Sequence, residues 1–184
     1  MKRYMSLAII GLFAVSAVAE EGNPVAQRDF EIDISEDRKK RYEKTDGKVY
    51  SRIRPYSYEL TIESRQDEPA TNLKLEYRIL IDRGLEVGRP RNRKYEKVEA
   101  VSDSVKLENL VRNKEVELMT KVVEIKKSSL DPNYYFQGNV TENSEDDLIG
   151  IWVRIYDGDT LLAEEAKPSS LPRQYRWKDG QPED

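Results

Sequence analysis

One segment of this sequence constrains its fold more than any other: residues 73–82 alternate between apolar and polar side chains. One phase carries Leu73, Leu75, Tyr77, Ile79 and Ile81, and the other carries Lys74, Glu76, Arg78 and Asp82. A period of two is typical of a β-strand with one buried face in an antiparallel sheet. The segment therefore predicts a half-buried strand.

The same alternation recurs along the chain. Similar runs occupy residues 30–34, 56–62, 116–122, 134–140, 149–156 and 161–166. A change of phase at Val123 and Ile125 can mark a β-bulge, and Asp157-Gly158-Asp159 between two β runs is a strong hairpin signal. About six to eight strands with turn signals between them predict an all-β, antiparallel two-sheet sandwich.

The first nineteen residues have the three parts of a secretory signal peptide. Lys2 and Arg3 supply a positive start, residues 7–18 are almost entirely apolar, and residues 17–19 form a small-x-small cleavage site. The apolar run ends short of the roughly 20 residues that a transmembrane helix needs. We expect a mature chain that begins at Glu20, export to a periplasm or the cell exterior, and no integral membrane segment after cleavage. An uncleaved anchor is the alternative.

Composition removes several classes of function. The 184-residue chain has neither Cys nor His, which excludes disulfides, zinc fingers, thiol nucleophiles and Ser-His-Asp triads. The net charge is −4, and becomes −6 when Lys2 and Arg3 are removed. That balance provides no overall basic field for nucleic acid or an anionic membrane. We expect no cofactor, no metal and no nucleic-acid partner.

The sequence predicts four regions. They are a signal peptide (residues 1–19), a charged N-terminal arm or linker (20–47), a β-sandwich domain (48–166) and a C-terminal extension (167–184). Residues 35–47, SEDRKKRYEKTDG, are nearly all charged, a composition typical of a solvated linker or a short surface helix. The alternative is a contact with nucleic acid or another polyanion through Arg38, Lys39, Lys40 and Arg41, which the interleaved acidic residues disfavour.

Four segments together resemble known modules. They read YSYELTIES, NLKLEYRILIDRG, VELMTKVVEIKK and GIWVRIYDGDTLLAEEA. Their succession resembles the immunoglobulin-like and fibronectin type III-like β-sandwiches of exported bacterial proteins, over roughly residues 49–177. The resemblance implies an Ig-like fold and no catalytic residue. The Cys-Trp-Cys core of antibody domains is missing, and sandwiches of this kind host many unrelated functions.

The most basic window of the mature chain is a candidate binding site. It spans residues 83–97, and its candidate binding residues are Arg89, Arg91, Arg93, Lys94 and Tyr95. Arginine side chains suit carboxylate, sulfate or phosphate groups, and the tyrosine could stack on a sugar ring. The alternative is a solvated hairpin, or an edge strand charged against aggregation.

Trp152 is a second candidate. It lies on the opposite phase of its strand from Ile151 and Val153, so it could form an exposed aromatic platform for a glycan or a peptide. The alternative is that the C-terminal segment, which includes Trp177, folds back and covers it.

The acidic run at residues 142–147 suggests a calcium site, because calcium takes six to eight oxygen ligands. Glu145, Asp146 and Asp147 lie together there, but the D-x-[DN]-x-[DN]-G pattern is missing. A polar loop between strands is therefore the favoured interpretation.

Together these features predict an exported, non-enzymatic binding or structural module. It would recognise a protein partner through strand edges and the basic window. One alternative is a carbohydrate-binding module that uses exposed aromatic side chains. A small hydrolase with paired carboxylates across a cleft is the least favoured class.

Overall fold

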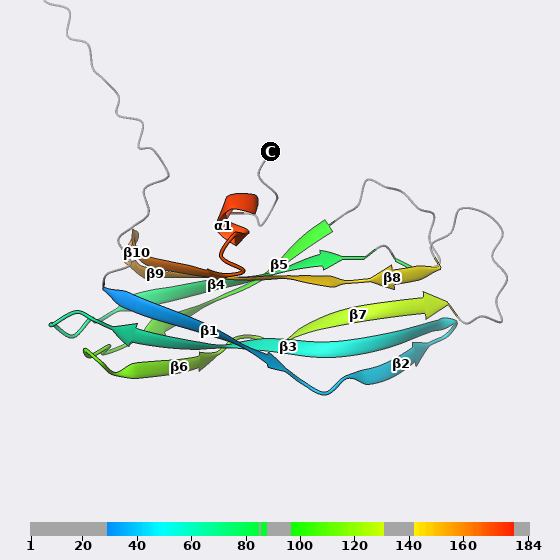
Figure 1. The fold of residues 1–184 in the computed structure, drawn as a ribbon, viewed down its shortest axis with the longest axis horizontal. Helices are drawn as coiled ribbons and strands as arrows, with labels where there is room; N and C mark the ends of the chain where they lie inside the picture. Colours follow the sequence, from blue (N-terminus) through cyan, green and yellow to red (C-terminus); the bar gives the residue numbers. More distant parts are fainter. Residues whose placement is uncertain (1–28, 85, 88–96, 131–141, 179–184) are drawn as a thin grey trace, which may run out of the picture.

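The computed structural model describes residues 29–84, 86–87, 97–130 and 142–178 of the chain. It is an all-β sandwich of two antiparallel sheets, with six and four strands (Figure 1), so the predicted fold class is confirmed. The elements are β1 (Phe30–Arg38), β2 (Tyr42–Asp46), β3 (Val49–Ser64), β4 (Leu73–Arg83), β5 (Lys97–Leu107), β6 (Glu115–Met119), β7 (Val123–Leu130), β8 (Asn143–Glu145), β9 (Asp147–Asp157), β10 (Thr160–Lys167) and α1 (Leu171–Gln174).

The six-stranded sheet is built around β3, which is 16 residues long. β1 and then β2 pair along one edge of β3, β6 and then β7 pair along the other, and β8 lies outside β7. At one break, residues 39–41 lie opposite Arg54 and Pro55. At the other, residues 120–122 lie opposite Ser57 and Tyr58. Each break sets three residues against two, as a β-bulge does. The change of phase at Val123 therefore marks a break between two strands, β6 and β7.

Pro55 explains the first break. A proline has no N–H, so within sheets it is confined to edges and bulges. The N–H of Lys39 donates to the carbonyl of Pro55 at 3.1 Å. The N–H and C=O of one strand residue point to the same side, so the missing donor also faces β1 and β2. Because Pro55 lies in the gap between β1 and β2, no ladder hydrogen bond is required from the N–H that it lacks.

The charged segment expected to be an arm is part of the sandwich. Residues 35–46 form the end of β1 and all of β2, and Phe30 and Ile34 of β1 are buried in the core. Every residue of β2 is exposed, so hydrogen bonds to β3 hold this strand rather than apolar burial. The sandwich therefore begins by Phe30, not at residue 48 as predicted.

The four-stranded sheet has the order β10-β9-β4-β5. β4 coincides with the alternating run that dominates the sequence, and the Asp-Gly-Asp signal forms the β9–β10 hairpin, with Gly158 at a φ of 56°. The structure adds β5, which the alternation did not reveal. β5 pairs antiparallel with β4, so the basic window connects these two strands.

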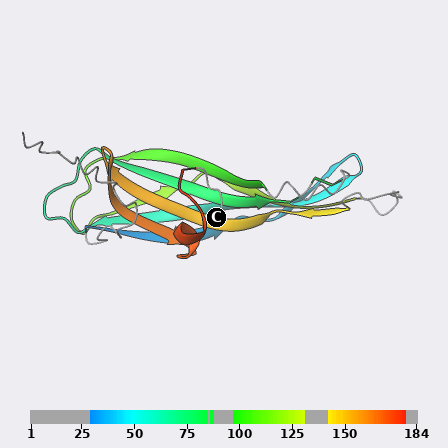
Figure 2. The same cartoon turned by 90° about the horizontal axis from the view of Figure 1, so that it is seen from above.

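Two apolar clusters hold the molecule together. The main core lies between the sheets and includes the fully buried Leu60, Ile62, Leu75, Ile79 and Ile151. A smaller cluster of Leu80, Trp152, Ala166 and Leu171 lies on the outer face of the four-stranded sheet, where α1 covers it (Figure 1). The molecule is elongated and tapers toward the end that carries β2 and β8 (Figure 2). Within the described ranges, no helix is long and apolar enough to span a membrane.

Candidate functional site

The six-stranded sheet continues past its two breaks and leaves the core. We call this part, made of β2, residues 49–56 of β3, β7 and β8, the ribbon. Among residues 49–56 only Ile53 is buried, and no residue of β2 is. In the rest of β3 the second sheet buries the inner face, whereas in the ribbon most side chains are exposed or half-buried.

The inner face of the ribbon carries a row of arginine and tyrosine. Tyr50, Arg52, Arg54 and Tyr56 share the phase of Tyr58, Leu60 and Ile62 along β3, and the last three are buried between the sheets. Because side chains alternate along a strand, the row is a direct continuation of the core face into solvent. Tyrosine and arginine are the residue types enriched at protein interfaces and their hot spots.

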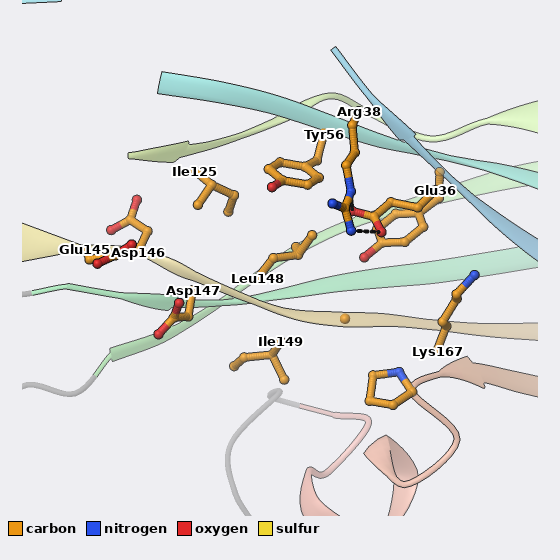
Figure 3. Close-up of a pocket in the computed structure, with 13 residues that line it drawn as sticks. Glu36, Arg38, Tyr56, Ile125, Glu145, Asp146, Asp147, Leu148, Ile149 and Lys167 are labelled. Atoms are coloured by element: carbon orange, nitrogen blue, oxygen red, sulfur yellow. Dashed lines mark hydrogen bonds and ion pairs between the residues drawn. The ribbon is translucent and has the colours of Figure 1, made fainter. Parts of the chain in front are cut away.

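Two adjoining depressions follow this row. The first, of about 480 Å³, opens where the sheets part, and its lining includes Arg38, Tyr58, Leu148 and Lys167 (Figure 3). The second, of about 340 Å³, lies on the ribbon. Its lining includes Arg41, Arg52, Arg54, Lys126 and Lys127. Both are lined by Tyr56, Ile125, Glu145 and Asp146. We call the two together the recognition groove.

Carboxylates neutralise several of the basic groups in the recognition groove. The Nε and Nη2 atoms of Arg38 donate to Glu36 at 3.0 and 3.1 Å (Figure 3), and this pairing raises the pKa of Arg38. Lys127 Nζ lies 2.6 Å from Glu145. Arg52 Nε lies 3.5 Å from Glu43, and its guanidinium stacks 5.7 Å from the Tyr50 ring.

Arg41 and Arg54 differ from these neighbours. Within the part of the chain that the structure describes, neither side chain makes a hydrogen bond or an ion pair. Arg54 is half-buried and Arg41 is exposed. As far as the described residues go, the recognition groove therefore holds two guanidinium groups whose donors are available to an outside acceptor.

A hydrogen bond and a buried tyrosine define the inner end of the recognition groove. Lys167 Nζ donates to the carbonyl of Ile34 at 3.0 Å, which ties β10 to β1 across the gap between the sheets. Burial raises the pKa of the Tyr58 hydroxyl, with smaller contributions from Glu36 and Tyr56. Tyr58 is therefore neutral at ordinary pH.

The acidic run at residues 142–147 forms β8 and the start of β9, and Asp146 between them is buried. Its carboxylate accepts hydrogen bonds from Arg83 Nη1 at 2.8 Å, Gly84 N at 3.1 Å and Lys126 N at 3.2 Å. Asp146 thus joins the end of β4 to β7. Burial lowers the pKa of Arg83, but hydrogen bonds to Glu99 and Asp146 outweigh it and leave that pKa raised.

The prediction that residues 142–147 form a polar loop is therefore wrong. These residues form β8 and the start of β9, and the Asp146 carboxylate is hydrogen-bonded to Arg83, Gly84 and Lys126. Among the described residues, no group of three or more Asp, Glu, His or Cys side chains is arranged to hold a metal ion. The sequence could not reveal the role of Asp146, because its donors come from residues about 20 and 62 positions away.

The sequence-predicted binding residues fall in two places. Arg89, Arg91, Arg93, Lys94 and Tyr95 lie outside the described residues. Trp152 faces away from Ile151 and Val153, as expected, but it is only 3% exposed. It is therefore not an exposed platform.

The C-terminal segment covers Trp152, as the alternative interpretation held. The Trp177 ring meets the Trp152 ring edge-on, with 5.0 Å between the centroids and 82° between the planes. The Arg154 guanidinium lies 4.7 Å from the Trp152 ring and 4.4 Å from the Trp177 ring. Leu171 completes the cover and is fully buried.

Sequence reasoning missed the arginine–tyrosine row, although a signal was present. The alternation recognised at residues 56–62 extends back in phase through Arg54, Arg52 and Tyr50. A phase that is apolar downstream and cationic upstream indicates a strand that leaves its core. That change marks the recognition groove.

No protein-family model matches the sequence, and no match is found among curated proteins. Among solved structures, a crystal structure from Akkermansia muciniphila is similar over 74% of this chain and 71% of that chain. The two are 8% identical, with a TM-score of 0.30. A likeness at that level carries no argument about family or function.

Proposed function

We propose that this chain is an exported, non-enzymatic binding module with an Ig-like sandwich, and that it recognises a protein partner. Exposed strand edges, the basic window at residues 83–97 and the recognition groove form the contact surface. The observation that carries the proposal is the row of Tyr50, Arg52, Arg54 and Tyr56, which continues the core face into solvent. Export rests on the signal-peptide pattern of residues 1–19.

The strand edges support this mode of binding. β5, of 11 residues, ends the order of the four-stranded sheet, and the three-residue β8 ends that of the six-stranded sheet. An edge strand presents unpaired N–H and C=O groups that can pair with an added strand of a partner. Main-chain hydrogen bonds of this kind provide affinity, and nearby side-chain sites provide specificity.

The other two classes have weaker support. A carbohydrate platform needs exposed aromatic rings, and Trp152 is covered by Trp177. A hydrolase needs free carboxylates across a cleft. Three carboxylates of the recognition groove, those of Glu36, Glu145 and Asp146, are instead bonded to Arg38, Lys127 and Arg83.

Crosslinked capture tests the proposal. The mature chain from Glu20 is used to capture partners from its native envelope extract, and each captured protein is then purified and titrated against it by calorimetry. In a variant of the basic window, Arg89, Arg91, Arg93 and Lys94 are changed to Glu. In the control, Lys114, Lys121, Arg173 and Lys178 are changed to Glu, which alters the charge equally at exposed positions outside the strands, the basic window and the recognition groove.

Saturable binding of a purified partner to the wild type and the control supports a binding module. Loss of that binding in the window variant places the contact on residues 83–97, and retention removes the window from the contact surface. If no captured protein binds in the titration, the proposal is wrong.

A further inference from the structure

We infer that the recognition groove binds an extended acidic peptide segment. Its carboxylates at alternate positions pair with Arg54 and with Arg52, which gives up its 3.5 Å contact with Glu43, and Arg41 lies beside them in the lining. This inference rests on the proposed function and names the chemistry of its ligand.

The spacing of the arginines favours an extended peptide. Arg52 and Arg54 are two residues apart on one face of β3, so their Cα atoms are separated by about 6.6 Å. An extended peptide presents alternate side chains at the same spacing. Carboxylates at two alternate positions can therefore meet the two guanidinium groups in register, and each pair can form two parallel hydrogen bonds.

Two other half-buried arginines have carboxylate partners that Arg54 lacks among the described residues. Arg83 and Arg154 are similarly half-buried, and their Nε atoms lie 2.7 Å from Glu99 and 2.6 Å from Glu164. A half-buried guanidinium normally has such a partner, because removing charge from water without compensation is unfavourable. Arg54 has none within the described residues. A ligand carboxylate would give Arg54 the partner that Glu99 gives Arg83 and Glu164 gives Arg154.

The rest of the lining favours a peptide over a densely charged polymer. Tyr56 and Ile125 give the recognition groove an apolar part, which suits the uncharged side chains of an alternating sequence. Glu145 and Asp146 lie in the same wall, and the whole chain has a net charge of −4. Because Glu145 and Asp146 are already paired with Lys127 and Arg83, it is the negative net charge that repels a polymer with one anionic group on every unit more than a peptide with carboxylates at alternate positions.

A labelled peptide gives a direct test. The probe is a fluorescein-labelled peptide in which Glu alternates with Thr and Val, and binding to the full mature chain is followed by fluorescence anisotropy at low salt. A peptide with Gln in place of Glu is the first control. A peptide of the same composition with its Glu residues consecutive is the second.

The variants separate the recognition groove from general charge. R41E/R54E reverses the two arginines that have no partner among the described residues. K44E/K114E makes the same charge change at exposed positions outside the lining of the recognition groove. R54K retains the charge but loses the planar fork. Circular dichroism and thermal melting verify that each variant is folded.

The expected result is saturable binding of the alternating peptide, with the Gln and consecutive-Glu peptides binding at least about tenfold more weakly. R41E/R54E loses about tenfold or more in affinity, R54K loses less, and K44E/K114E stays within about twofold of the wild type.

Three results overturn the inference. They are no binding of the alternating peptide, equal loss in R41E/R54E and K44E/K114E, and a sulfated polysaccharide that displaces the peptide at lower concentration than unlabelled peptide does. If the peptide does not bind but the captured partner does, the proposed function stands without this ligand chemistry. If the peptide binds but capture finds no partner, the recognition groove has the inferred chemistry and a protein-binding role fails.

Discussion

At the residue scale, Gly150 is the glycine with the least room for a side chain among those that the structure describes. It lies where the pairing of β9 with β4 changes register, at a φ of 151°. A Cβ atom there would collide with the carbonyl of Lys167 and approach Pro168 and Leu171. The smaller cluster and its cover therefore depend on a residue without a side chain.

Gly150→Ala is expected to lower the free energy of unfolding by about 2–4 kcal/mol, because the backbone of Lys167 cannot yield without moving β10. Urea denaturation measures the change. Gly158→Asn is the matched control: Gly158 has a φ of 56° and open space around it, and asparagine tolerates that conformation. The control is expected to cost less than about 1 kcal/mol. Equal losses in the two variants would show that contact at Gly150 is not the cause.

Tyr58 predicts a pH dependence. Burial raises its pKa above the ordinary value of 10.0, so above pH 10 the unfolded chain loses this proton while the folded chain keeps it. The stabilisation is complete below pH 10 and decreases as the pH rises toward the folded pKa. Tyr58→Phe removes this contribution, so its stability is expected to decline less steeply than that of the wild type between pH 9 and 11. Denaturant unfolding at each pH compares the slopes, and identical slopes contradict the prediction.

At the scale of elements, Asp146 connects the junction of β8 and β9 to the end of β4 and to β7, at the edge of the recognition groove. Its carboxylate receives the side chain of Arg83 and the backbone N–H groups of Gly84 and Lys126. Gly84 approaches so closely that a Cβ there would lie 2.6 Å from Ser144 Oγ. The end of β4 is thus held against the β8–β9 junction.

Asp146→Asn is expected to cost about 2 kcal/mol, because one oxygen becomes an N–H₂ group that faces donors and the Arg83 charge loses a partner. Amide hydrogen exchange at Gly84 and Lys126 is expected to accelerate, since both N–H groups donate to this carboxylate. Asp147→Asn changes the adjacent carboxylate, which is exposed, and is expected to leave stability within about 0.5 kcal/mol. Unchanged exchange at both amides in Asp146→Asn would rule out this role.

The C-terminal segment at Trp177 and Lys178 is likewise attached to the strands beneath it. Besides its contact with Trp152, the Trp177 ring lies 5.1 Å from the Arg78 guanidinium, and Arg78 Nη1 donates to the carbonyl of Lys178 at 2.8 Å. Arg78 of β4 and Arg154 of β9 therefore hold the C-terminal segment against the four-stranded sheet.

Trp177→Ala is expected to expose Trp152 and to cost about 1–2 kcal/mol, from lost burial and lost arginine–ring contacts. The chain has two tryptophans, so emission from the variant comes from Trp152 alone and should shift to longer wavelength. Arg173→Ala, at an exposed position of α1, should leave the spectrum unchanged. An unshifted emission maximum in Trp177→Ala would mean that Trp152 is covered by something else.

At the scale of the whole molecule, local alternation predicted most of the fold. β4, β9 and β10 follow from period two and an Asp-Gly turn, because each of these signals lies within a few residues. The strands at residues 35–46 could not be found in this way. Most of their side chains are polar or charged and exposed. Hydrogen bonds to β3, and side-chain contacts such as the one from the Tyr42 hydroxyl to Glu124, keep them in the sheet, and no local pattern encodes these contacts.

The candidate site was less predictable for the same reason. The arginine–tyrosine row is visible in the sequence once the strand is known to extend back to Val49. The available donors of Arg54, and the engagement of Asp146 by distant residues, depend on how strands far apart in the chain come together. Residue type indicated a basic surface, but only the pairing of strands located the recognition groove.

The strand order of the four-stranded sheet also determines when this protein can fold. β4 ends at Arg83, yet its inner neighbour β9 begins at Asp147. A ribosome must make most of the chain before β9 exists and can pair with its edge of β4. Contacts between such distant segments form late, because the loop between them must close first. For about a third of the chain's synthesis, from the end of β4 to the start of β9, the edge of β4 that later pairs with β9 therefore stays unpaired, and an unpaired strand edge is a site at which partly made chains can associate wrongly.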